Sequence, residues 1–269
     1  MRSWKTGMPD HLDILANDAI KSIKDKYYDY KAPTKVAASP KSLKEAILGC
    51  KRIPIISEIK FASPSKGTMR ENYFEVEKIA KDMEKGGAVG ISILTEPKHF
   101  NGHVKFISQA RNQVNVPILM KDIILSPAQI DAAHRNGANA ILLIQTLFER
   151  DYCEKDIQSM IEYSHSRNLE VLLEVHTEEE FLKTNETNAD MIGINNRDLK
   201  TLKVNLEVTK RILNKYSTDG NVIVSESGIN NPEDIRLLRK YGAQAFLVGT
   251  TIMKAKNIQE KVKQLVESQ

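Results

Sequence analysis

The chain has 269 residues, of which 41% are apolar and 28% are charged, so it is long enough to bury a sizeable core. Its 39 basic and 35 acidic residues are mixed along the sequence, and the net charge of +4 does not indicate nucleic acid binding, which usually shows as a basic stripe or block. No apolar run approaches the roughly 18 residues of a membrane-spanning helix. We therefore expect neither a nucleic acid nor a membrane partner, and the slight basic excess fits an anionic small molecule as well as an ordinary solvated surface.

The cysteines and histidines give no sign of a disulfide framework or a metal site. Cys50 and Cys153 lie far apart in the sequence, and none of the six histidines stands at a ligand spacing from another histidine or a cysteine. The N-terminus lacks the apolar segment of a signal peptide. These features predict a reduced, cytoplasmic protein without a bound metal.

Short runs rich in Ile, Val and Leu alternate with longer amphipathic stretches along most of the chain. The short runs predict strands at residues 53–60, 89–94, 116–122, 140–144, 170–175, 191–195, 221–225 and 245–248. The longer stretches predict helices at residues 74–85, 127–136, 151–168, 178–187, 206–216, 232–241 and 254–266. The second of these helices has clear end signals, with Ser126 as cap, Pro127 in the first turn and Gly137 just past the end.

Eight strands that alternate with helices predict an α/β fold of the (β/α)8 TIM barrel type. A doubly wound open sheet is the alternative, but it would normally carry a glycine-rich dinucleotide fingerprint after its first strand, and the sequence has none there. Residues 11–28 and 42–48 have helical periodicity, and residues 32–40 look like a loop. We expect residues 1–269 to form one barrel domain in which residues 1–50 are an N-terminal helical extension.

The first expected strand is apolar on one face and charged on the other. Ile55 and Ile59 fall on one face, whereas Glu58 and Lys60 fall on the opposite face near the end of the strand. Burying a carboxylate and an ammonium is costly, so such an arrangement is kept mainly when the charges act on something.

Several other expected strands also end in polar side chains, at the face where barrel enzymes place their catalytic groups. A single lysine or glutamate at such a position is usually a solvated surface residue, and a structural ion-pair network is the alternative for the whole set. Convergence on one rim nevertheless favours an active site. The residues are Lys121, Glu174, Asn195, Arg197, Glu226 and Ser227.

Small residues follow the last two expected strands. Gly228 follows the seventh strand, and Gly249 and Thr250 follow the eighth. Barrels often bind phosphate with these two loops and a helix N-terminus, where backbone amides approach the ligand closely. The pattern predicts a phosphate site.

Seven segments in the same order resemble the indole-3-glycerol-phosphate synthase family of tryptophan biosynthesis, from about residue 40 to the end of the chain. Any one of them alone would be unspecific. They are SEIKFASPSKG, SILTEPKHFNG, PILMKDIIL, LLEVH, GINNRDL, SESGI and FLVGTTIM.

The resemblance implies a carboxy-lyase that closes an indole ring. Its substrate would be 1-(2-carboxyphenylamino)-1-deoxyribulose 5-phosphate, and its products indole-3-glycerol phosphate, carbon dioxide and water. It implies no metal and no organic cofactor. We expect a monomer, although the residues themselves leave the oligomeric state open.

The resemblance also implies residue roles. Lys121 is the general acid at the substrate ketone, and Glu174 is the base of the dehydration. Lys60 pairs with the substrate carboxylate or donates in the dehydration, and Glu58 holds Lys60. The residues implied to bind substrate are Asn195, Arg197, Glu226, Ser227, Phe100 and Leu142, and those implied to bind its phosphate are Ser63, Gly228, Gly249 and Thr250.

Three positions depart from the family pattern, and one of them, Asn196 in place of a common serine, is not expected to matter. Phe61 stands where a basic residue is common, and Ile123 stands where phenylalanine is frequent, so both affect the expected affinity for substrate. His176, two positions after Glu174, lies close enough to reach the rim. Three other functions remain as alternatives: a phosphoribosylanthranilate isomerase, a Schiff-base aldolase, and a phosphate-ligand sensor without activity.

Overall fold

The computed structural model describes residues 9–31, 41–64, 67–69, 75–218 and 220–268. Eight parallel strands close into a barrel in the order β1-β10-β9-β8-β7-β6-β5-β4, which confirms the predicted (β/α)8 fold. An open sheet is excluded because β1 pairs with β10 on one side and with β4 on the other. The barrel strands are β1 (Ile55–Ile59), β4 (Gly90–Leu94), β5 (Ile118–Lys121), β6 (Ala140–Ile144), β7 (Glu170–Val175), β8 (Met191–Asn195), β9 (Val222–Glu226) and β10 (Ala245–Val248).

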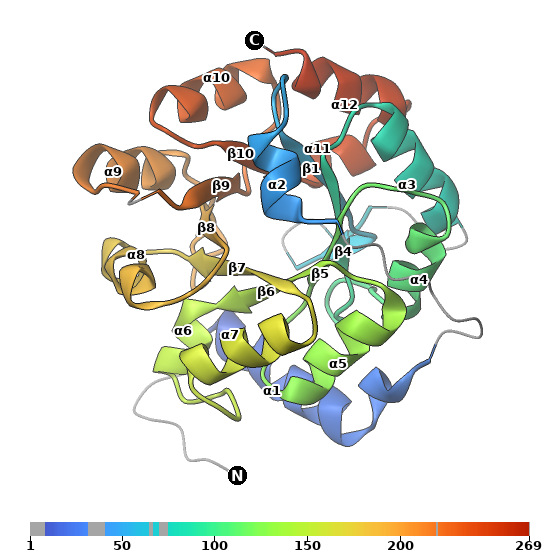
Figure 1. Cartoon of the computed structure of the whole chain (residues 1–269), viewed down its shortest axis with the longest axis vertical. Coiled ribbons are helices and arrows are strands. Elements are labelled where there is room, and N and C mark those ends of the chain that lie inside the picture. Colours follow the sequence, from blue (N-terminus) through green and yellow to red (C-terminus); the bar gives the residue numbers. More distant parts are fainter. Residues whose placement is uncertain (1–8, 32–40, 65–66, 70–74, 219, 269) are drawn as a thin grey trace.

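Helices surround the barrel, and the N-terminal helices lie at its two ends (Figure 1). Before the barrel come α1 (His11–Lys24), the 3₁₀ turn η1 (Tyr27–Asp29) and α2 (Leu43–Leu48). The later helices are α3 (Val76–Lys85), α4 (Lys105–Arg111), α5 (Pro127–Asn136), α6 (Gln145–Glu149), α7 (Ile157–Ser166), α8 (Glu178–Lys183), the 3₁₀ turn η3 (Thr184–Glu186), α9 (Glu207–Lys215), α10 (Pro232–Lys240), α11 (Thr250–Met253) and α12 (Ile258–Val266). A short hairpin, β2 (Ala62–Ser63) with β3 (Gly67–Thr68), follows β1.

The structure adds α4, α6 and the hairpin to the elements that the sequence predicts. Neither α4 nor α6 has a side-chain hydrogen bond at its N-cap, so the usual start signal is missing from the sequence. The two strands of the hairpin have two residues each, too few to show a period of two.

Two predicted helices have the wrong bounds. The helix expected at 151–168 begins only at Ile157, because Asp156 caps it through the N–H of Ser159. The helix expected at 254–266 begins only at Ile258, after the cap Asn257, and a separate short helix, α11, ends at Met253 before the expected range. The loop expected at 32–40 and the first position of the helix expected at 74–85 lie outside the described residues.

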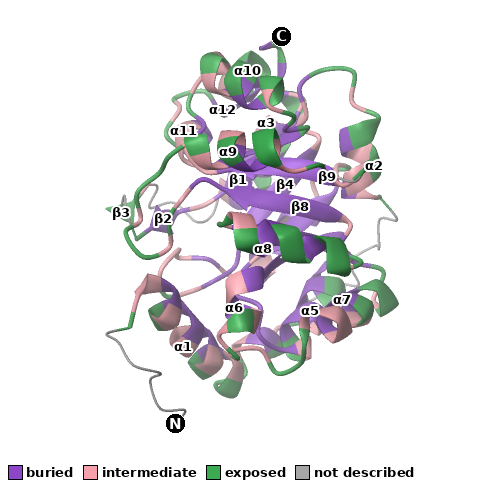
Figure 2. Ribbon diagram, turned by 90° about the vertical axis from the view of Figure 1, so that its left-hand side faces the viewer, coloured by how far each residue is buried: buried purple, intermediate pink, exposed green. Residues whose placement is uncertain are grey.

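Alternate residues of each strand enter two different apolar clusters, as the period-two pattern predicts. Ile55 and Ile59 face outward and pack in the layer between the barrel and its helices. Ile56, Leu119 and Leu172 face the barrel interior. The strands are therefore buried on both faces, whereas the helices carry exposed residues on their outer faces (Figure 2).

Helix α2 closes the end of the barrel where the strands begin. The Glu170 carboxylate, at the start of β7, accepts the backbone N–H of Leu43 at 2.6 Å and of Lys44 at 3.3 Å. The side chain of Leu43 covers Gly90 so closely that a Cβ atom there would overlap it. Figure 2 shows α2 and the β2–β3 hairpin at opposite ends of the barrel, so the hairpin marks the end where the strands finish.

Helix α1 covers the opposite end, near the strand C-termini, and a clamp of charged residues holds it there. Arg150, which follows α6, donates from Nη2 to Asp10 at 2.8 Å and from Nη1 to Asp13 at 2.8 Å. The Tyr152 hydroxyl donates to the same Asp13 at 3.0 Å. The packing of α1 and α2 on the barrel supports the single-domain organisation, which stays a prediction.

Replacing Arg150 with Ala should loosen α1 without unfolding the barrel. The pairs are partly exposed, so we expect a loss of about 1 kcal/mol, or roughly fivefold faster amide hydrogen exchange in α1. Mass spectrometry of the exchanged protein measures this, and barrel strands should exchange at the parent rate. Lys21→Ala is the control, because Lys21 is mostly exposed and pairs only within α1. Equal α1 exchange in Arg150→Ala and the parent would contradict the clamp.

Candidate active site

The residues that the sequence predicts for the site come together in one pocket of about 520 Å³ at the C-terminal ends of the strands. None of the predicted positions lies elsewhere. They are Glu58, Lys60, Ser63, Phe100, Lys121, Leu142, Glu174, Asn195, Arg197, Glu226, Ser227, Gly228, Gly249 and Thr250.

Strand register places the charged side chains on the inward face, at the ends of their strands. Leu94 of β4 stands beside Lys121, Ile144 of β6 stands beside Glu174, and Asn195 of β8 stands beside Glu226 at the ends of β8 and β9. Paired residues of parallel neighbours point to the same face, so these polar side chains share the barrel interior with the apolar residues below them.

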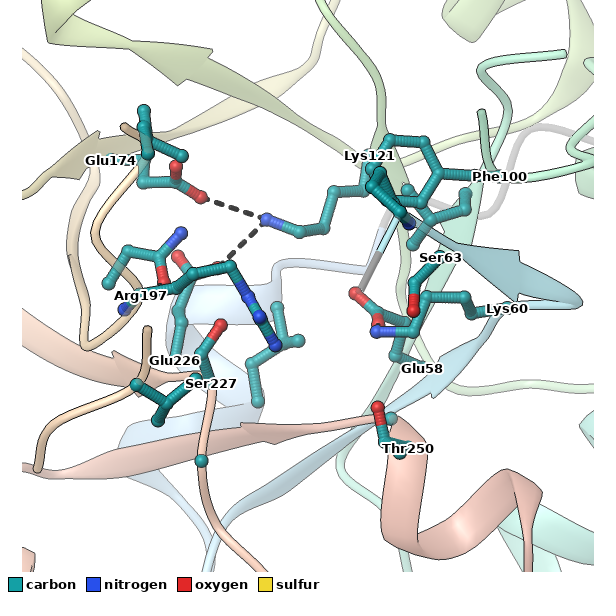
Figure 3. A pocket seen from close by; sticks show the side chains of 18 of the residues that line it. Glu58, Lys60, Ser63, Phe100, Lys121, Glu174, Arg197, Glu226, Ser227 and Thr250 are labelled. Atoms are coloured by element: carbon teal, nitrogen blue, oxygen red, sulfur yellow. Dashed lines mark hydrogen bonds and ion pairs between the residues drawn. The ribbon is translucent and has the colours of Figure 1, made fainter. Parts of the chain in front are cut away.

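Lys121 extends across the pocket to two carboxylates (Figure 3). Its Nζ donates to Glu174 Oε2 and to Glu226 Oε2, each at 2.9 Å. Both glutamate side chains are almost completely buried, at 2% and 1% exposure, whereas the lysine side chain keeps 16%. The ammonium is thus the most accessible member of the cluster.

Burial and charge act against each other in this cluster. Burial alone would lower the pKa of Lys121, but the two carboxylates outweigh it and raise that pKa, so the side chain is an ammonium at neutral pH. Burial would raise the pKa of Glu174, but Lys121 and His176 lower it below its usual range. Burial raises the pKa of Glu226 to about 7 in spite of Lys121.

A second ion pair faces this cluster from β1. Lys60 Nζ lies 2.6 Å from Glu58 Oε1, and Figure 3 shows the pair across the pocket from Glu174. The Glu58 carboxylate occupies the space that a side chain at Gly249 would fill. Glycine at this position therefore lets the carboxylate pack against the end of β10.

A second glycine has the same use on the other side of the pocket. A Cβ atom at Gly193, in β8, would collide with Glu226 Oε1. Since Gly193 has a conformation open to any residue, close approach rather than backbone freedom explains the glycine.

The loop after β8 shapes the third side of the pocket. Asn195 Oδ1 accepts the backbone N–H of Arg197 at 3.0 Å, and the Arg197 guanidinium donates from Nη1 to the carbonyl of Leu202 at 2.9 Å. Burial lowers the pKa of Arg197 somewhat, although the group stays charged. Asn196 points away into a buried network with Ser225, so its difference from the family pattern does not reach the pocket.

The expected phosphate residues meet at the ends of β1, β9 and β10. Ser227 and Gly228 both have positive φ, 67° and 86°, and the serine is unusual in this conformation. A Cβ at Gly228 would collide with Val204. The buried Ser63 hydroxyl has no hydrogen-bond partner within the described part of the chain, which leaves it available to a ligand.

The remaining wall of the pocket is apolar. It contains the predicted Phe100 and Leu142 and also Ile123, the position that departs from the family pattern. The other departing residue, Phe61, packs outside the pocket against Phe106, with ring centroids 5.4 Å apart. A phenylalanine instead of a basic residue at position 61 therefore does not change the set of residues that line the pocket.

Sequence reasoning missed the part of the pocket that α1 supplies. His11, Leu12 and Leu15 line it, and no motif marks them because they are spaced like any apolar helix face. Glu96 was also missed; its carboxylate accepts the backbone N–H groups of His99 and Phe100 and so fixes the loop that carries the phenylalanine. The segment SILTEPKHFNG contains this glutamate, so the signal was present.

The described residues contain no group of three or more His, Cys, Asp or Glu side chains that could hold a metal ion. Among the same residues, no helix has the length and apolar character needed to cross a membrane.

Fold and pocket together define a (β/α)8-barrel enzyme with titratable groups at the strand C-termini. The family model described as indole-3-glycerol phosphate synthase matches residues 13–265. A protein of that name from Methanocaldococcus jannaschii is 44% identical over 83% of this chain and 82% of its own length. Another, from Campylobacter fetus subsp. fetus, is 40% identical over 84% of this chain and 85% of its own length. The chain belongs to the indole-3-glycerol phosphate synthase family.

Solved structures of other proteins share the fold. A thiamine phosphate pyrophosphorylase from Pyrococcus furiosus superposes with a TM-score of 0.57 at 18% identity, over 84% of this chain and 97% of that one. At this identity the likeness supports the barrel alone.

Gly193→Ala should reduce turnover without removing any polar group. The added methyl displaces the Glu226 carboxylate, and a misplacement near 1 Å costs about 10²-fold in kcat/KM. Steady-state kinetics measures the loss, and circular dichroism checks that the fold is kept. Gly49→Ala, outside the pocket lining, is the control, because its Cβ would meet only the Glu45 carbonyl oxygen at 3.2 Å, a tight contact that requires a much smaller shift than the one at Gly193. Parent-level kcat/KM in Gly193→Ala would contradict the close packing of Glu226.

Proposed function

We propose that this chain converts 1-(2-carboxyphenylamino)-1-deoxyribulose 5-phosphate into indole-3-glycerol phosphate, carbon dioxide and water. Membership of the family supports the reaction. The observation that carries the proposal is the placement of the Lys121 ammonium between Glu174 and Glu226, with the Lys60–Glu58 pair opposite. These two lysines and three glutamates, together with Arg197 in the same partly apolar pocket, suit an anionic substrate and repeated proton transfer.

Ring closure needs an acid at the substrate ketone, and Lys121 supplies it. The raised pKa keeps the group protonated, and the ammonium is accessible from the pocket. The aromatic carbon that bears the carboxylate bonds to the ketone carbon while the ketone oxygen takes a proton from Nζ. The Phe100, Leu142 and Ile123 wall receives the aromatic ring, and it keeps water from the reacting atoms.

Loss of carbon dioxide and of water completes the reaction. Lys60 pairs with the substrate carboxylate, whose carbon–carbon bond then breaks to restore the aromatic ring. In the dehydration, Glu174 removes a proton from carbon, and a lysine protonates the departing hydroxyl. The lowered pKa of Glu174 keeps it ionised as a base, although it also makes that base a weak one in the free enzyme. Glu58 holds Lys60 in position for either role.

The other predicted residues orient the substrate. Asn195, Arg197, Glu226 and Ser227 surround its sugar chain, and all four line the pocket. The phosphate lies among the residues predicted for it, and the unpartnered Ser63 hydroxyl supports this placement. The residues are Ser63, Gly228, Gly249 and Thr250.

The proposal also covers the cellular compartment and the oligomeric state of the protein. Cys50 and Cys153 are free thiols, which suits a reducing compartment, so we assign the enzyme to the cytoplasm. The pocket draws its lining from one chain, so a monomer acting as a single domain suffices for activity.

Indole fluorescence on addition of the carboxyphenylamino sugar phosphate tests the function directly. The purified chain should form indole-3-glycerol phosphate and release carbon dioxide in equal amounts. An isomerase would release no carbon dioxide, and a sensor would bind the substrate without turnover. A Schiff-base aldolase would be inactivated by borohydride in the presence of substrate, which the proposed reaction would not show. Absence of indole fluorescence at high enzyme concentration rejects the proposal.

Lys121→Met should abolish most of the activity, because the methionine fills similar space and carries no proton. We expect kcat to fall about 10²-fold or more, the scale of general acid catalysis. Stopped-flow or steady-state fluorescence measures it. Lys78→Met, at an exposed position on α3, removes a lysine outside the pocket and should keep the parent kcat. Parent-level turnover in Lys121→Met would show that another group is the acid.

A further inference from the structure

His176 stands directly behind Glu174 and outside the pocket lining. It follows β7, and its side chain is only 9% exposed. Its Nε2 lies 3.1 Å from Glu174 Oε1, and its Nδ1 lies 3.5 Å from Glu180 Oε2. Both are ion-pair distances without hydrogen-bond geometry, so the contacts act through charge. The sequence places this histidine near the rim, and the structure shows that it faces a carboxylate on each side.

Glu180, on α8, is itself held in place. The Thr146 hydroxyl of α6 donates to Glu180 Oε1 at 2.5 Å, and the backbone N–H of His176 donates to Oε2 at 2.6 Å. A continuous line of polar groups therefore runs from Lys121 through Glu174 and His176 to Glu180. Its far end is fixed to the helical shell.

Two charged side chains face His176 directly. Glu174 faces it from β7 and Glu180 faces it from α8. Beyond Glu174 lies Lys121 of β5, and that ammonium is shared with Glu226 of β9. Beyond Glu180 lies a neutral hydroxyl. The nearest charges on both sides of the imidazole are thus negative.

Burial would lower the pKa of His176, but contacts with the two carboxylates reverse this and raise the pKa to about 9. The imidazolium persists below that pH and is lost above it. At neutral pH a buried positive charge therefore lies against Glu174.

The two carboxylates that share Lys121 differ in their second oxygen. Glu174 Oε1 faces His176. Glu226 Oε1 is buried and has no hydrogen-bond partner among the residues that the structure describes. When the two glutamates share one proton, protonating Glu226 therefore costs less free energy than protonating Glu174. Only Glu174 would lose a favourable contact with a second cation.

We propose that His176 is a positioning residue: as an imidazolium clamped between Glu174 and Glu180, it keeps Glu174 ionised and aimed at Lys121, and it directs the shared proton to Glu226. This inference rests on the proposed function for its catalytic meaning. Glu174 is then available as the base, while a protonated Glu226 donates a hydrogen bond from Oε1 to substrate.

The sign of the expected pH dependence follows from the charges. Removing the imidazolium removes one of the two cations that lower the pKa of Glu174, so that pKa rises. The base is then lost by protonation at a higher pH than in the parent. Activity on the acidic side should therefore fall, while activity at higher pH should change less.

His176→Gln tests this, because glutamine keeps a hydrogen-bond donor and lacks the charge. We expect the acidic limb of the kcat/KM profile to move upward by about 1 pH unit or more, with an approximately tenfold loss below that limb. His165→Gln is the matched control, since His165 pairs with Asp190 on the surface and should leave the profile unchanged. An acidic limb at the parent pH in His176→Gln overturns the inference, whatever happens to the overall rate.

A second measurement needs no substrate, and its first part uses the parent protein alone. Nitrogen-15 NMR of the histidine side chains in the parent protein should show His176 doubly protonated at pH 7.5, and in Glu180→Gln its pKa should fall by about 1 unit or more. A neutral His176 at pH 7 overturns the inference. The two proposals fail separately, because absent indole formation by the parent rejects the function, whereas the NMR titration addresses His176 alone.

Discussion

The site depends on opposite charges that are buried together. A carboxylate or an ammonium taken out of water alone is strongly destabilising, and each charged group here is tolerated because a counter-ion lies within hydrogen-bonding distance. The same low exposure that makes each charge costly also strengthens its effect on its neighbours. The same contact keeps Lys121 protonated and Glu174 ionised, which is what the proposed acid and base roles require.

The barrel positions these charged side chains through the arrangement of its strands and through glycines that leave room for them. Strand register turns Lys121, Glu174 and Glu226 inward at the ends of their strands, and missing side chains at Gly193 and Gly249 make room for the carboxylates. Apolar residues on the outward faces of the same strands carry the packing. Stability and chemistry thus use alternate residues of the same strands, which explains how a charged interior coexists with a well-packed fold.

Sequence predicted the barrel and the pocket well because both follow from strand periodicity. A period of two fixed which face Glu58, Lys121 and Glu174 occupy, and the barrel fold then brought their strand ends together. The features that the sequence did not predict depend on contacts between segments that are far apart in the chain. The α1 residues at the pocket carry an ordinary apolar pattern, and the function of His176 depends on Glu180, which faces it only once α8 has folded back. Short uncapped helices also leave too little local signal.

The clamp between Arg150 and α1 differs from the catalytic charges in one respect: it is partly in contact with solvent. Dissolved ions screen such a pair over a Debye length of about 8 Å at physiological ionic strength, whereas pairs buried in the pocket are much less affected. Rising ionic strength should therefore weaken the attachment of α1 before it disturbs the ion pairs inside the pocket. The helix that covers the pocket is the part whose anchoring responds most to salt.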